Sequence, residues 1–264
     1  MGVTCSPFPA TEDATKMIAP YLRRGMAAGL LAGLLAGFFA FFFGEPSMDG
    51  AIQIEEAAAA GQHEEAVVGG HSHKQEEEVF SRSTQKIGLF FATGLSGVLV
   101  GGLFGMAYAY FGGRLASESE WTRSLSLAGA AFFGAFLVPF LKYPASPPTI
   151  GEPSTIGSRT TAYFAMVTLS LLVVLGAWYV ARMLRERGVA APARQLAVGL
   201  GIAVTMGVLF LILPAAPDPG EFPAGLLWDF RISSLGTQLV LWVGLGVIFG
   251  LLCERANRRE PLGS

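Results

Sequence analysis

The sequence predicts an all-α protein, a polytopic bundle of about six transmembrane helices. Of its 264 residues, 52% are apolar and 14% are charged, whereas a soluble globular chain is about a quarter charged. The mean hydropathy of +0.50 points the same way. Six apolar runs have about the 20 residues that a helix needs to cross a bilayer. The polar remainder is too scattered for a second soluble domain, so we expect one membrane domain over residues 1–264.

The six expected spans each rest on one apolar run. In chain order they cover residues 22–44, 86–111, 124–142, 160–182, 195–215 and 234–253. The third is short and carries Pro139 near its end, so it could be a broken or re-entrant helix that lines protein or water. The other five are long enough to cross as regular helices.

Small residues recur every fourth position in four of these runs, a spacing that lets helix backbones approach closely. The sets are Gly25, Gly29, Gly33 and Gly37; Gly97, Gly101 and Gly105; Gly199, Ala203 and Gly207; and Gly246 and Gly250. Static packing seams are the ordinary interpretation in a bundle, and sliding or gating surfaces are the alternative.

The distribution of charge predicts the orientation, because cytoplasmic flanks collect Lys and Arg. With six spans and the N-terminus inside, the inner side carries twelve basic and seven acidic residues, and the outer side carries six basic and thirteen acidic residues. Both termini are therefore expected in the cytoplasm. An odd number of spans would export the basic tail.

The longest polar segment, residues 45–85, is expected outside the cytoplasm. It contains all three histidines, His63, His71 and His73, among nine carboxylates. Imidazole and carboxylate ligands suit divalent ions such as Co²⁺, Ni²⁺ and Zn²⁺, without choosing among them. An ordinary solvated, unstructured loop is an equal alternative, although residues 52–60 favour a short surface helix. Glu45 stands apart because it lies at the membrane edge, where a carboxylate is costly unless solvated or paired.

Two further outer connections carry charged residues at membrane edges. Lys142 ends the third span and either extends toward water or provides a fixed cation beside a pathway. After a proline-rich stretch, Arg159 begins the fourth span, where it could pair with Glu152. Before the sixth span, Asp229 and Arg231 flank Phe230, in a segment that is either a short interfacial helix or a lid over the bundle.

Several functional classes lack support in the sequence. There is no basic stripe for nucleic acid, no phosphate-binding glycine loop, no catalytic serine elbow and no histidine within a span. We therefore expect no enzymatic activity and no permanently bound cofactor. The spans contain almost no ionisable residues, so backbone carbonyls near Pro139 or Pro214, with Met106, Met166 or Met206, are the remaining intramembrane ligands. Methionine at such positions is usually packing.

The outer connections resemble those of the CbtA family, the predicted cobalt-transporter subunit. The similar strings are FGEP at 43–46, LKYPASPPTIG at 141–151, RTTAY at 159–163 and FPAGLLWDFRISSLGTQLVLW at 222–242. The resemblance covers essentially the whole chain. It implies a multi-pass protein of the bacterial inner membrane, linked to cobalamin, that works beside a small one-span, histidine-rich partner. The family is often described with five spans, whereas the charge distribution favours six.

These observations lead to one hypothesis and one rival. The hypothesis is a subunit of a Co²⁺ uptake system, in which His63, His71, His73 and Glu45 bind metal. Lys142, Glu152, Arg159, Asp229 and Arg231 are its candidate pathway or loop-closing residues. The rival is a non-transporting membrane scaffold or metal-sensing protein. Membrane lipid is an expected partner in both, and a homo-oligomer is possible.

Overall fold

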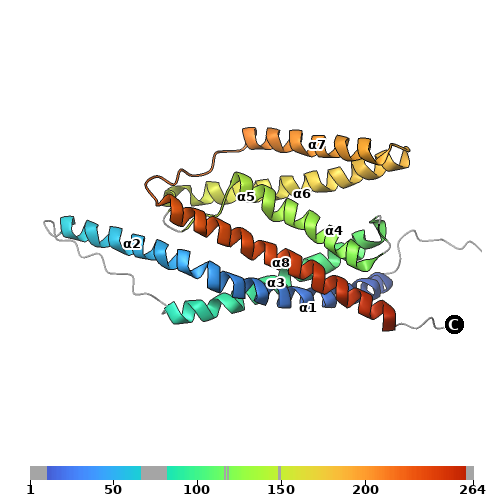
Figure 1. The fold of residues 1–264 in the computed structure, drawn as a ribbon, viewed down its shortest axis with the longest axis horizontal. Helices are drawn as coiled ribbons and strands as arrows, with labels where there is room; N and C mark the ends of the chain where they lie inside the picture. Colours follow the sequence, from blue (N-terminus) through green and yellow to red (C-terminus); the bar gives the residue numbers. More distant parts are fainter. Residues whose placement is uncertain (1–10, 67–81, 116, 118, 148–149, 260–264) are drawn as a thin grey trace, which may run out of the picture. The chain divides into compact units, whose positions relative to one another are not determined.

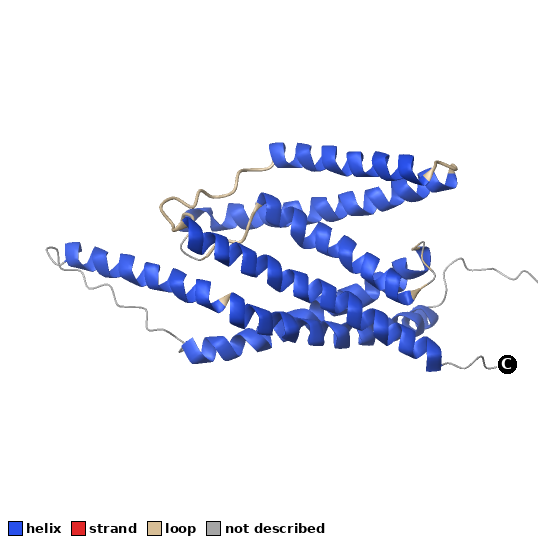
Figure 2. Cartoon of the chain, in the orientation of Figure 1, coloured by secondary structure: helices blue, strands red, loops and turns tan. Residues whose placement is uncertain are grey.

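The computed structural model describes residues 11–66, 82–115, 117, 119–147 and 150–259, and in these residues every regular element is a helix (Figure 2). Six helical segments are long and apolar enough to cross a membrane, which confirms the predicted fold class. They are α1 (Thr11–Phe43), α3 (Arg82–Phe111), the run from α4 (Glu120–Phe132) through η2 (Phe133–Leu137) to α5 (Val138–Lys142), α6 (Ile156–Glu186), α7 (Ala191–Ile212) and α8 (Ala224–Arg259) (Figure 1).

Six membrane crossings alternate in direction. We therefore expect residues 44–83, 143–155 and 213–223 on one face, which we call the loop face, and both termini on the other. That the loop face is extracytoplasmic stays a prediction from the charge distribution.

The chain divides into two compact units, each described by itself. Unit 1 comprises Met1–Phe41, Glu77–Gly129 and Thr237–Ser264, and unit 2 comprises Phe42–Glu76 and Ala130–Gly236. Whether they form one membrane domain, as the sequence predicts, stays open.

In unit 1, α1 and α3 pack through their glycines. A Cβ atom on Gly29 would overlap the carbonyl oxygen of Gly97, and one on Gly101 would overlap that of Gly25. Because the obstructing atoms are backbone, no rotamer change could make room. The predicted seam between these two spans is therefore confirmed.

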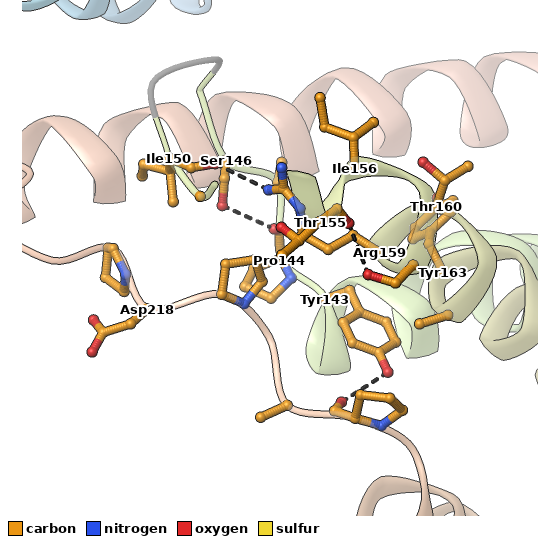
Figure 3. A pocket seen from close by; sticks show the side chains of 18 of the residues that line it. Tyr143, Pro144, Ser146, Ile150, Thr155, Ile156, Arg159, Thr160, Tyr163 and Asp218 are labelled. Carbon is orange, nitrogen blue, oxygen red and sulfur yellow. Dashed lines mark hydrogen bonds between the residues drawn. The ribbon is translucent and has the colours of Figure 1, made fainter. Parts of the chain in front are cut away.

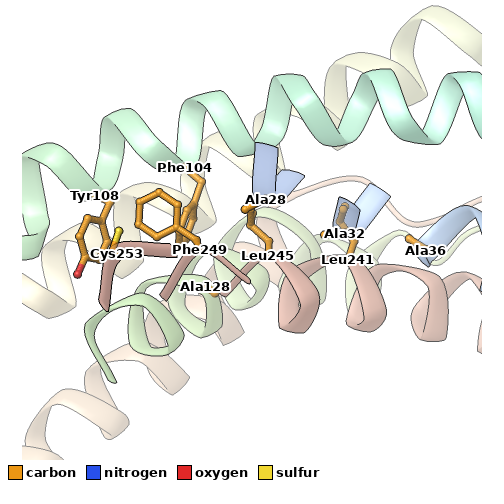
Figure 4. Packing of buried hydrophobic residues seen from close by; sticks show 10 residues of the cluster. All are labelled: Ala28, Ala32, Ala36, Phe104, Tyr108, Ala128, Leu241, Leu245, Phe249 and Cys253. Carbon is orange, nitrogen blue, oxygen red and sulfur yellow. The ribbon is translucent and has the colours of Figure 1, made fainter. Parts of the chain in front are cut away.

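The core of unit 1 lies beside this seam (Figure 4). Small residues of α1, such as Ala28 and Ala32, face large ones of α8, such as Leu245 and Phe249. The predicted seam in α8 is used as well, because Gly246 meets Ala128 of α4. Beside it, the buried Ser124 hydroxyl donates to the Gly246 carbonyl at 2.7 Å. Close approach thus permits a hydrogen bond between helices in apolar surroundings.

In unit 2, α6 and α7 lie side by side and pack with α5 and η2 (Figure 1). Buried Val138, Met166 and Met206 form the core. The predicted seam in α7 is wrong for contacts within the described chain, since a Cβ on Gly199 or Gly207 would meet nothing within 4 Å. These glycines belong to a face that no described residue covers.

The third span is continuous rather than broken. Pro139 lacks an N–H and its ring would clash with a carbonyl one turn earlier. The helix widens there into the π-helical η2, in which the Val138 N–H donates to the Phe133 carbonyl. The Gly134 carbonyl in this segment accepts a hydrogen bond from the buried Ser170 hydroxyl of α6. The proline is thus accommodated inside the span.

Two expected short helices are parts of longer ones. The segment Leu226–Phe230 is not a separate interfacial helix but the first turns of α8, which begins at Ala224. The expected short helix at 52–60 is part of α2 (Glu45–Ala66). In α2, Ala51 is buried and Gly50 lies against Leu226, with 3.1 Å between a Cβ at position 50 and Cδ1 of that leucine. Packing on α8 explains why the helix is longer than its propensity alone predicts.

Candidate functional site

A pocket of about 1420 Å³ in unit 2 is lined by residues of the connections that we expect on the loop face (Figure 3). Its walls come from the connection after α5, the first turns of α6 and the connection after α7, with Glu55 of α2 at its edge. We call it the loop-face pocket.

Arg159 and a glycine turn shape one wall. Nη1 of Arg159 donates to the Ile150 carbonyl at 3.0 Å, and Nη2 donates to the Glu152 carbonyl at 3.4 Å. Gly151 between them has φ +94° and lies against the guanidinium, so a side chain there would be strained and obstructed. The predicted neighbours Arg159 and Glu152 do meet, but through the main chain of Glu152. The carboxylate itself remains exposed on the pocket wall.

Lys142 and Tyr143 attach the end of α7 to the end of α5. Phe210 lies four residues before Pro214, which has no N–H, so its carbonyl lacks the usual helical donor. Lys142 Nζ donates to that carbonyl at 2.8 Å. The Tyr143 hydroxyl donates to the Pro214 carbonyl at 2.9 Å, a contact that Figure 3 shows. Burial raises the pKa of Tyr143 above its usual value. We call these two contacts the α5–α7 latch.

Arg231 joins a third element to this wall. Its Nε donates to the Ala145 carbonyl at 3.3 Å, so the start of α8 holds the connection after α5. Asp229 is exposed on α8 and does not line the pocket. Of the predicted residues, Glu152 and Arg159 therefore line the pocket, and Lys142 and Arg231 bond to main-chain carbonyls of Phe210 and Ala145. Asp229 does neither.

The pocket carries both signs of charge. The exposed carboxylates of Glu55, Glu152 and Asp218 line it, against the one guanidinium of Arg159. Such a wall attracts cations, and its exposed carboxylates can bind a hydrated ion through its water shell. Among the described residues, however, no group of three or more His, Cys, Asp or Glu side chains is arranged to hold a metal.

The predicted metal ligands are mostly beyond what the structure describes. His71 and His73 lie outside the described residues, and His63 lies in α2 with its side chain undescribed. Glu45 is half-buried in the first turn of α2, where the helix dipole favours a carboxylate. Its role as a ligand stays a prediction.

The methionines divide by unit. Met166 and Met206 are buried in the core of unit 2, whereas Met106 is 43% exposed on α3 in unit 1. Met166 and Met206 contact Val138 and aromatic side chains, the surroundings of a packing residue.

Sequence reasoning missed Tyr143, Asp218 and Glu55. Pro214 has no N–H, so carbonyls near the end of α7 need another donor, and this requirement could have pointed to Tyr143. Asp218 opens an Asp-Pro-Gly turn in which its Oδ1 accepts the Gly220 N–H at 3.0 Å and Gly220 has φ +58°. That pattern predicts the turn but not the pocket. Glu55 resembled the other glutamates of its segment.

Comparison with known proteins gives one match. A family model described as "Probable cobalt transporter subunit (CbtA)" matches residues 18–254, which include the first five described spans, most of the sixth and the whole loop-face pocket. No curated protein and no solved structure matches significantly.

Proposed function

Since the chain belongs to the CbtA family, we propose that it is the membrane subunit of a cobalt uptake system whose ion enters at the loop-face pocket. Membership implies a cobalt transporter subunit, and six apolar helices make it a multi-pass membrane protein. The observation that carries the entry site is that carboxylates from three separate elements, Glu55, Glu152 and Asp218, line one pocket. These exposed groups attract Co²⁺ without removing its water shell.

In this proposal the segment 45–85 gathers the ion before entry. His63, His71 and His73 lie among acidic residues in it, and imidazole with carboxylate binds borderline divalent ions reversibly. Glu45 joins this segment to the membrane. For an uptake role the segment must face the outside of the bacterial inner membrane, in agreement with the charge distribution.

The arrangement of the cations supports a structural role for them. Lys142, Arg159 and Arg231 each donate to main-chain carbonyls of the connections. They hold the pocket walls in place, and their charges are directed to the protein rather than to the ion.

The family description as a subunit supports a partner, for which we propose a small one-span, histidine-rich protein. A transporter subunit also implies a non-enzymatic role, with Co²⁺ as cargo rather than as a resident cofactor. The rival proposal, a non-transporting scaffold or metal-sensing protein, requires the same loops to act only as a docking surface.

Uptake of radioactive cobalt by cells that carry the chain with and without its partner tests the proposal. We expect Asp218→Asn and Glu152→Gln each to lower uptake at subsaturating cobalt about two- to fivefold, from one lost screened charge. Glu221→Gln is the matched control, because Glu221 is exposed on the same connection as Asp218 but does not line the pocket.

Deletion of residues 62–78 and Glu45→Gln test the capture segment separately. We expect both to raise the cobalt concentration needed for half-maximal uptake. If pocket variants and the Glu221 control behave alike, the pocket is not the entry. If cells with both proteins take up no more cobalt than cells with neither, the scaffold or sensing alternative replaces transport.

A further inference from the structure

A shallow groove on the outside of α6 continues from the loop-face pocket. It has a volume of about 630 Å³ and is lined by Thr160, Thr161, Phe164, Ala165, Thr168 and Leu169. Thr160 and Phe164 line both the groove and the pocket, so the two are contiguous. The groove residues recur at intervals of three and four, which places them on one face of the helix.

The groove is apolar despite its three threonines. The Thr161 hydroxyl donates to the Gly157 carbonyl at 2.9 Å, and the Thr168 hydroxyl donates to the Phe164 carbonyl at 2.9 Å. With these hydroxyls bonded to their own helix, the side chains present methyl groups outward. Phe164, Ala165 and Leu169 add apolar side chains to this face, which suits a hydrocarbon chain.

The length of the groove matches one leaflet of a bilayer. From residue 160 to 169 the helix rises about 14 Å, close to half of the roughly 30 Å hydrocarbon thickness. The groove begins at the end of α6 that bears the loop-face pocket. It therefore runs from the headgroup level toward the middle of the membrane.

Arg159 provides a cation where the groove enters the pocket. Within the described residues it forms no ion pair, because both of its acceptors are main-chain carbonyls. Its Nε is buried without a hydrogen-bond partner, and two other N–H groups of the guanidinium remain for a ligand. Its place in the first turns of α6 adds the positive end of the helix dipole. A phosphate diester is the anion that a membrane offers at this level.

We infer that the groove and the adjoining edge of the pocket bind a phospholipid with a phosphate and a primary ammonium in its headgroup, of the phosphatidylethanolamine type. Arg159 binds the phosphate, and an acyl chain lies in the groove between Phe164 and Leu169. The Glu152 carboxylate, on the connection that Arg159 holds, lines the same pocket and accepts hydrogen bonds from the ammonium. A headgroup without a cation would be repelled by the carboxylates of the pocket, with no attraction to offset this repulsion.

Lipid retention by the purified full-length protein tests this inference without cobalt, so its outcome is independent of the proposed transport. The protein is exchanged in detergent against an equimolar mixture of phosphatidylethanolamine, phosphatidylcholine and phosphatidylglycerol, and retained lipids are counted by native mass spectrometry. We expect preferential retention of phosphatidylethanolamine, lowered about tenfold by Arg159→Gln through loss of a charge-assisted contact. Arg182→Gln, at the other end of α6, should retain as much as the unaltered protein.

Two further variants separate the headgroup from the chain. Ala165→Leu should fill the groove and weaken retention of all three lipids alike, whereas Ala203→Leu on the exposed face of α7 should not. If Arg159→Gln does not fold, the headgroup preference of the unaltered protein decides. Equal retention of the three lipids, preference for phosphatidylglycerol, or equal effects of Arg159→Gln and Arg182→Gln would each overturn the inference.

Discussion

Removal of the Lys142 ammonium should lower the free energy of unfolding, and the size of this loss should depend on Pro214. Lys142→Met keeps most of the aliphatic stem but leaves the Phe210 carbonyl without its 2.8 Å donor. A hydrogen bond from a charged donor contributes about 1.5–3 kcal/mol, and we expect the lower end because Lys142 is half-exposed. Tyr143→Phe removes the second contact of the α5–α7 latch, a neutral bond of about 0.5–1.5 kcal/mol.

Pro214→Ala provides the decisive comparison. Leu213 is extended, with ψ 150°, as expected for a residue before proline, and this ends α7. Alanine at 214 restores an N–H and lifts that restriction, so the helix can extend and its own backbone can satisfy Phe210. Lys142→Met should then cost at least about 1 kcal/mol less in the Pro214→Ala background than alone, a coupling typical of groups that share one partner.

The assay is equilibrium unfolding in mixed detergent micelles, followed by circular dichroism. The four proteins compared are the unaltered protein, Lys142→Met, Pro214→Ala and the double variant. Lys142→Arg is the control that keeps a charged donor, and it should be destabilised less than Lys142→Met. Additive effects of Lys142→Met and Pro214→Ala would refute the reasoning. They would show that the lysine acts by extending toward water, the simpler alternative that the sequence left open.

Three other expectations follow from the described contacts. Gly29→Val should destabilise the α1–α3 packing by more than 2 kcal/mol, since the obstructing atoms are backbone, whereas Gly199→Val, at a position with open surroundings, should change detergent unfolding by less than about 0.5 kcal/mol. Ser124→Ala should cost about 1 kcal/mol in the same assay because its buried bond to Gly246 is lost, and Thr168→Ala, whose bond lies within one exposed helix, should cost less. Single cysteines at positions 152 and 218 should react with an impermeant thiol reagent in intact cells, and one at position 187 should not; the reverse pattern would contradict the assigned orientation.

The sequence predicted the spans and the glycine seams well because both depend on short-range regularity. Apolar runs define the helices, and glycines every fourth residue define the face that Gly25 and Gly29 present. The same pattern in α7 produced a wrong prediction. The spacing of small residues indicates that a helix face can pack closely, but it does not indicate whether another helix lies against that face. Gly199 and Gly207 have no such neighbour in the described chain.

The candidate site was harder to predict because its parts are brought together by tertiary contacts. Glu152 and Asp218 are separated by two spans, and no local pattern indicates that they share a pocket. The start of α8 at Ala224 was missed for a related reason. A window of apolar residues ends where Asp229 and Arg231 begin, but helical structure continues beyond the apolar part when the end of the helix packs on other elements.

The role of Lys142 was hard to predict because it depends on a proline in another span. A proline that ends a span leaves the carbonyl one turn before it without a helical donor, and the membrane edge supplies little water to replace it. Lys142 occupies that role for Pro214, although the two residues are 72 positions apart in the chain. A lysine at the end of one span and a proline after another are therefore each ordinary in isolation. Only the contact between the end of α5 and the end of α7 makes them complementary, because it brings the Lys142 ammonium to the Phe210 carbonyl that Pro214 leaves without a helical donor.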